Sequence, residues 1–177
     1  MDPQPPAENR ILAATVDNCT LMVVSGAATF KLAPSFKQAM QAAILAGSAL
    51  IVVDMAPCLS MDSTFMGAIA LMGFSLQKSD TTRLVFINLS PHAHALLNGL
   101  GVNRILKTYP AGALPEGLGD LSRLEQSLRP VHASPASEHE MAALMYDAHE
   151  TLTRVDPENL KRFQDVLAFL REDLKRF

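Results

Sequence analysis

Short apolar runs alternate with amphipathic and polar segments through most of the chain. Two of these runs, Leu50–Asp54 and Leu84–Leu89, are predominantly apolar along their whole length, which is typical of strands that helices cover on both faces. Near the start, two alternating segments meet at Asp17-Asn18, a pattern that predicts a strand pair joined by a turn. The predicted strands are Arg10–Val16, Thr20–Ser25, Leu50–Asp54, Leu84–Leu89 and, at an edge of the sheet, Val102–Leu106.

Helix signals lie between these strands. Pro34 suits the first turn of a helix that continues to Ala46, and a glycine ends the helix predicted over Pro91–Gly99. A long apolar helix follows Ser63, and Asp120 caps a last one whose leucines share a face. This order predicts an α/β fold with a mixed sheet of four to five strands, followed by a C-terminal helical extension.

The chain divides by composition into four parts. Residues 1–9 are polar and proline-rich, without the positive start and apolar stretch of a secretory signal, and predict a disordered lead. Residues 10–128 form the α/β domain, and the prolines and small polar residues of 129–137 are typical of a linker. Residues 138–177 predict two helices, Glu138–Arg154 and Pro157–Phe177.

The second of these helices has an apolar seam with spacings of three and four residues. The seam is shorter than a confident coiled coil, so it fits either a hairpin that folds back on the rest of the chain or a contact between molecules. The second alternative predicts a homo-oligomer or a partner contact through Leu160, Phe163, Leu167, Leu170 and Leu174.

Composition narrows the class of protein. The 177 residues are 49% apolar with a net charge of −3, which describes a soluble globular protein. Acidic residues outnumber basic ones and only 6% are aromatic, so we expect no nucleic acid partner. The apolar runs are shorter than the about 20 residues that cross a membrane, so we expect a cytoplasmic protein without a membrane span.

No metal or cofactor site is predicted. Cys19 and Cys58 match neither a disulfide framework nor a zinc pattern, and we expect reduced buried thiols. The five histidines lack the spacing of a metal-binding helix. We expect them on solvated helix surfaces.

The candidate functional residues lie between the predicted strand Leu50–Asp54 and the start of the apolar helix. Asp62 and Ser63 stand at the helix start, where unpaired N–H groups and a partial positive charge gather. One interpretation is that these two residues only cap the helix. The other is a presented hydroxyl, because a phosphate on Ser63 would be tolerated at a helix N-terminus.

The order of strand, acidic residue, loop, Asp-Ser-Thr and glycine-bearing helix resembles the STAS domain of bacterial anti-sigma factor antagonists. In that family, Asp-Ser-(Ser/Thr)-Gly-Leu-Gly opens the second helix, and Asp62–Gly67 match it here. The resemblance extends over roughly Arg10–Leu128. Its further matches are the strand Leu21–Gly26, Asp54, Ser90-Pro91, Gly101-Val102 and Ile105.

The resemblance implies a phospho-regulated protein-binding module rather than an enzyme. Ser63, with Thr64 as the alternative, would be phosphorylated by an anti-sigma factor that is also a serine kinase, and a serine phosphatase would reverse this. The implied partner surface consists of Met61, Asp62, Ser63, Thr64, Phe65, Met66, Gly67 and Gly26.

The chain departs from the family pattern in two places. Phe65 replaces the first glycine, so its ring either enters the core or stands as an anchor in the interface. Ala27, Ala28 and Thr29 replace the family's acidic residues after Gly26. Part of the usual partner surface is therefore altered.

Two other functions stay open at this point. The chain fits an unphosphorylated STAS scaffold or regulatory subunit, of the stressosome type or as the small partner of a lipid-transport ATPase. More remotely, a serine hydrolase also presents a serine between a strand and a helix. It needs small residues two positions either side, where this chain has Met61 and Phe65.

Overall fold

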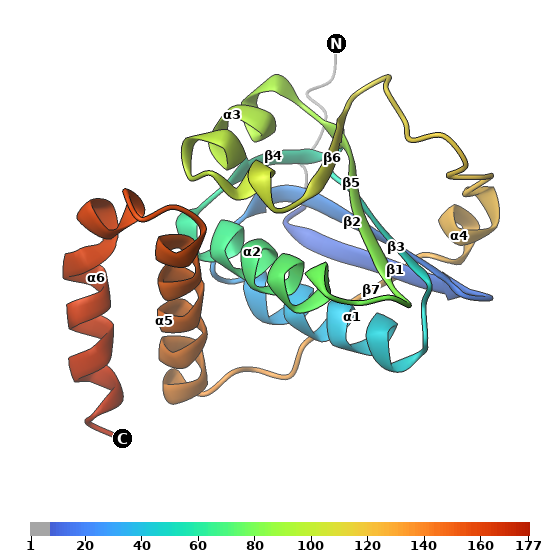
Figure 1. Ribbon diagram of the computed structural model, residues 1–177. Helices are drawn as coiled ribbons and strands as arrows, with labels where there is room; N and C mark the ends of the chain where they lie inside the picture. Colours follow the sequence, from blue (N-terminus) through green and yellow to red (C-terminus); the bar gives the residue numbers. More distant parts are fainter. Residues whose placement is uncertain (1–7) are drawn as a thin grey trace, which may run out of the picture.

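Seven strands form one mixed sheet in the computed structural model, which describes residues 8–177 (Figure 1). Six follow the order β6-β5-β3-β2-β1-β7, and β4 pairs with the end of β2. Strand β1 is antiparallel to β2 and β7, whereas the other pairs are parallel. The predicted mixed sheet is confirmed. The strands are β1 (Arg10–Val16), β2 (Cys19–Ala28), β3 (Leu50–Asp54), β4 (Cys58–Met61), β5 (Arg83–Leu89), β6 (Lys107–Pro110) and β7 (Arg129–Pro130).

Helices cover both faces of this sheet. The larger core lies between the sheet and α1, α2 and α3, and a smaller one forms under α4, where Leu124 packs with Val52 and Val85. This double cover explains why β3 and β5 are predominantly apolar. The helices are α1 (Ala33–Leu45), α2 (Ser63–Gln77), α3 (Pro91–Gly99), α4 (Ser122–Ser127), α5 (Glu138–Val155) and α6 (Asn159–Leu174), with the 3-10 helix η1 at Val102–Arg104.

The strand predicted at Val102–Leu106 is wrong. Gly101 has a φ of 74°, and this left-handed residue starts a tight turn, so η1 follows and β6 begins only at Lys107. The predicted linker also begins with structure, because β7 pairs with β1 and the Val131 amide donates to the Ile11 carbonyl at 2.9 Å.

The predicted disordered lead, 1–9, lies largely outside the described residues. Its last residue is described, and Asn9 Oδ1 accepts a hydrogen bond of 2.7 Å from the Ala27 amide. Within residues 8–177, none of the helices combines the length and the apolar character needed to cross a membrane.

Helices α5 and α6 form a hairpin beside α2, on the side away from α4 (Figure 1). A capping box at Ser137 and Glu140 starts α5. Helix α5 packs along α2, and α6 packs on α5 with Leu167 and Leu170 buried. The hairpin thus folds back on the first domain, one of the two arrangements that the seam left open, and association between molecules stays a prediction.

Candidate functional site

The first turn of α2 is held in place by Asp62. One carboxylate oxygen of Asp62 accepts from the Phe65 amide at 2.8 Å and caps the helix. The other accepts from the Phe30 amide at 2.7 Å, which ties the segment after β2 to the same point. Ser63 is the first helical residue rather than the cap, so its hydroxyl is available for another contact.

Strand β4 leads into this turn and aligns it with the end of β2. Gly26 pairs with Cys58, and the Asp62 amide donates to the Ala28 carbonyl at 3.1 Å. Gly26 needs its left-handed φ of 75° at this point, where the register of the two strands shifts. The structure therefore brings the predicted residue Gly26 close to the predicted segment Met61–Gly67.

The Ser63 hydroxyl contacts a histidine 86 positions away in the sequence. Its Oγ lies 2.9 Å from Nε2 of His149, and Nδ1 of that ring lies 2.7 Å from the Met145 carbonyl oxygen. Because a carbonyl only accepts, Nδ1 donates to it, and in the neutral ring Nε2 then accepts from the Ser63 hydroxyl. His149 is 3% exposed, and its ring meets the edge of Phe163 at 5.0 Å between centroids.

The expectation of solvated histidines is wrong for His149. It lies on the same face of α5 as Met145 and Leu152, and this face packs on α2. The signal was present in the sequence, since His149 interrupts an apolar stripe at helical spacing. The other four histidines are exposed, as expected.

Helix α5 approaches α2 closely at Gly67. A Cβ added to Gly67 would collide with the carbonyl of Ala148 and lie 2.7 Å from its side chain. Only a glycine at this position allows the two helices to come so near. Ser63 and Gly67, one turn apart, therefore face the same neighbour.

Most of the predicted partner residues are buried. Phe65 is 0% exposed and its ring centroid lies 5.2 Å from that of Phe36, so the ring enters the core and leaves no surface for a partner. Thr64, the alternative acceptor, is 3% exposed. Asp62 and Ser63 are half-buried, and the remaining members of the predicted surface, Met61, Met66, Gly67 and Gly26, are buried.

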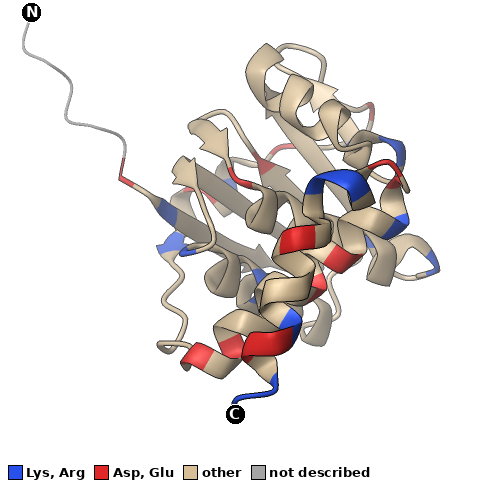
Figure 2. Ribbon diagram, turned by 90° about the vertical axis from the view of Figure 1, so that its left-hand side faces the viewer, with Lys and Arg blue, Asp and Glu red and all other residues tan. Residues whose placement is uncertain are grey.

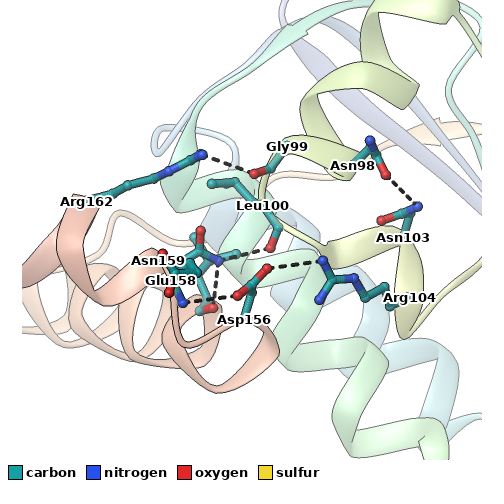
Figure 3. A network of polar contacts seen from close by, with 10 residues as sticks. Asn98, Gly99, Leu100, Asn103, Arg104, Asp156, Glu158, Asn159 and Arg162 are labelled. Atoms are coloured by element: carbon teal, nitrogen blue, oxygen red, sulfur yellow. Dashed lines mark hydrogen bonds and ion pairs between the residues drawn. The ribbon is translucent and has the colours of Figure 1, made fainter.

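A second set of contacts fixes the turn between α5 and α6 to the body of the protein (Figure 3). The Asn159 side chain donates to the carbonyls of Leu100 and Leu152, both at 2.9 Å. Arg104 pairs with Asp156 at 3.2 Å. Arg162 adds a hydrogen bond of 3.1 Å to the Gly99 carbonyl. These polar contacts join the turn to α3 and η1.

A serine bonded to an oriented histidine is also the arrangement that serine nucleophiles use. The two cavities described, of about 590 Å³ and about 430 Å³, are lined by other residues. The first lies between the end of α2, β5 and β6, and the second between α1, the linker and α5. Within residues 8–177, the acidic residues, cysteines and histidines form no cluster that fits a metal ion.

Comparison with known proteins identifies a family and a similar fold. The family model described as "Mlab, STAS domain" matches residues 11–107. An anti-sigma factor antagonist from Mycobacterium paratuberculosis has a similar fold, at 19% identity and a TM-score of 0.50, over 58% of this chain and 86% of that one. A candidate anti-sigma factor antagonist from Thermotoga maritima gives 19% identity and 0.50, over 56% and 86%. The search of curated proteins found no match.

Proposed function

The chain belongs to the STAS-domain family, and on that premise we propose that it is a protein-binding module, an anti-sigma factor antagonist switched by phosphorylation of Ser63. The observation that carries the proposal is the position of Ser63. It begins α2 beside a helix end that Asp62 already caps, so its hydroxyl has no part in holding the helix. A modification of this hydroxyl leaves the cap and the sheet intact.

A phosphate at this position changes the charge of the surface and leaves the sheet in place. It brings a charge of about −1.5 to −2 and three strong acceptor oxygens to a turn that is otherwise neutral apart from Asp62. Acidic groups of a partner would be repelled by it, and an apolar partner surface would have to desolvate it. Binding to the anti-sigma factor is lost, and a serine phosphatase restores it.

The partners are therefore an anti-sigma factor that also acts as the serine kinase, and the phosphatase. They meet the chain in the cytoplasm. The contact is made by the half-buried residues Asp62 and Ser63 and by the neighbouring turn of α2. The proposed role is one of binding and assigns no catalytic step to Ser63.

A second candidate is an unphosphorylated scaffold or regulatory subunit, including the small partner of a transport ATPase. The bond between Ser63 and His149 favours it, because the hydroxyl already has a partner within the chain. In that case α2 would act as a fixed surface.

Phosphopeptide mass spectrometry of the protein isolated from its own cells, with and without phosphatase treatment, separates the two. We expect one phosphate on the peptide that contains Ser63, lost in Ser63→Ala and kept in the matched variant Ser75→Ala from the same helix. We also expect an anti-sigma factor to co-purify with Ser63→Ala and not with Ser63→Asp. If Ser63 is unmodified and the anti-sigma factor co-purifies equally with both variants, the phosphorylation switch is rejected and the scaffold role is supported.

A further inference from the structure

The face of α2 that carries Ser63 and Gly67 has an occupant of its own, helix α5. We propose that α5 holds this docking surface in place of the anti-sigma factor, and that the partner binds by displacing α5 with a helix of similar chemistry. The inference rests on the proposed function for the identity of the partner. The occupation of the surface rests on the geometry alone.

The contacts define what an occupant of this surface needs. Gly67 admits a helix only where a small residue faces it, as Ala148 does. Ser63 needs an acceptor one position further along that helix, which His149 Nε2 supplies at 2.9 Å. Around these two points the contact is apolar, since Leu152 is buried in the main core and Leu144 packs against it. A competing partner presents a helix with a small residue, an acceptor and an apolar flank.

The hairpin is attached in a way that allows it to leave as a unit. The linker is bonded to the sheet at Val131, and among the described residues no backbone hydrogen bond ties 132–136 to the rest of the protein. The far end of α5 is fixed by polar contacts of Asn159, Asp156 and Arg162 (Figure 3). When these polar contacts open, water replaces the lost hydrogen-bond partners, so the net cost in free energy is small.

The surface charge of the hairpin agrees with this. Both acidic and basic residues lie on the side of α5 and α6 that faces the viewer in Figure 2. The side turned to α2 carries Ala148, His149 and Leu152, none of which is Asp, Glu, Lys or Arg. The hairpin therefore has one solvated face and one face suited to α2.

The same geometry links Ser63 phosphorylation to the hairpin. Ser63 Oγ and His149 Nε2 are 2.9 Å apart, which leaves no space for a phosphorus atom and its oxygens between them. A kinase reaches Ser63 only when α5 has moved away, and a phosphate on Ser63 prevents its return to this position. The open form is therefore the one that both the kinase and the anti-sigma factor meet.

Hydrogen exchange on the unaltered full-length protein gives the first test. We expect the amides of α5, α6 and the first turn of α2 to show protection at least about tenfold lower than those of β3 and β5, because the hairpin opens without global unfolding. Equal protection in all these elements would overturn the inference, since the hairpin would then be part of one cooperative core.

A variant on the hairpin itself gives the second test and leaves α2 unchanged. Ala148→Leu places a bulky side chain against Gly67 and forces α5 off, whereas the control Glu150→Leu adds the same side chain at an exposed position of α5. The probe is a fluorescein-labelled peptide of residues 138–177. We expect it to bind full-length Ala148→Leu, and neither the wild type nor Glu150→Leu.

Failure of the peptide to bind a folded Ala148→Leu, or equal binding to all three proteins, overturns the inference. If Ala148→Leu does not fold, the exchange result on the wild type decides. With the anti-sigma factor as ligand, we expect Ala148→Leu to bind at least about tenfold more tightly than the wild type, because its competent form is more populated. If Ala148→Leu binds the peptide but not the anti-sigma factor, the proposed function is rejected, whereas the conclusion that α5 occupies this surface of α2 stands.

Discussion

Replacement of Phe65 by alanine tests whether this residue belongs to the core or to the partner surface. Its side chain is 0% exposed and lies 5.2 Å from the ring of Phe36, at an interplanar angle of 54°. Truncation of a buried phenylalanine costs about 3–5 kcal/mol, because transfer energy is lost and a cavity remains. The tilted pair with Phe36 contributes about 0.5–1.5 kcal/mol beyond burial, so we expect a loss of stability in the upper part of that range.

Urea unfolding of wild type and Phe65→Ala, followed by circular dichroism, measures this loss as a lower midpoint at an unchanged slope. The matched control is Leu45→Ala, a large residue that is 88% exposed, for which we expect a change within about 0.5 kcal/mol. A double-mutant cycle with Phe36→Ala isolates the ring pair. A loss below about 1 kcal/mol for Phe65→Ala, accompanied by weaker partner binding, would refute the core placement and make Phe65 an anchor in the interface.

Three further changes test the hairpin and the thiols. Ser137→Ala removes the cap of α5 and should cost about 1 kcal/mol in urea unfolding. The Ser137 amide and hydroxyl lower the pKa of Glu140 below its usual 4.5, so the stability that this carboxylate contributes is complete above pH 4.5 and is lost as the pH falls through the lowered pKa. Glu140→Gln should abolish that part of the acid dependence of the urea midpoint, and an unchanged dependence would show that the capping box does not titrate. Asn159→Ala leaves the Leu100 carbonyl without its side-chain donor and the Leu152 carbonyl with the Asp156 amide alone. It should lower the hydrogen-exchange protection of α5 and α6 more than that of the sheet; equal loss everywhere would contradict a separately opening hairpin. Burial raises the pKa of the Cys58 thiol, so iodoacetamide should label Cys58 in the native protein far more slowly than in urea, and equal rates would contradict its burial.

The sheet was predictable where strands are covered on both faces. Leu50–Asp54 matches β3 at both ends, and Leu84–Leu89 differs from β5 by one residue, because continuous apolar runs have few other solutions in a mixed fold. Strand β4 was not predicted, since Cys58–Met61 is short and its buried and exposed residues do not alternate regularly. The apolar residues of Val102–Leu106 have the pattern of a strand, but the left-handed turn at Gly101 leads into a 3-10 helix there.

The start of α2 was predictable because the signals for a helix end are local. Asp62 caps within three residues, and the serine that follows is visible from the motif alone. The partner of Ser63 was not predictable in this way. His149 reaches it from the other end of the chain, and such a contact depends on how the hairpin folds back. The expectation from the sequence went only as far as an apolar face on the helix Glu138–Arg154 that needs a cover.

Gly67 carries both a local signal in the sequence and a long-range contact in the structure. A glycine inside a long helix weakens that helix by about 1 kcal/mol relative to alanine, so it needs a reason in packing or function. The structure gives the reason as a close approach to the backbone at this turn of α2. In this protein the approaching group is the Ala148 backbone. The family model ends at residue 107, so the helix that fills this space lies outside the part of the chain that the family describes. The element in direct contact with Ser63 and Gly67 therefore lies beyond the region that the family model matches. Under the proposed function, a partner reaches that serine only when α5 moves away.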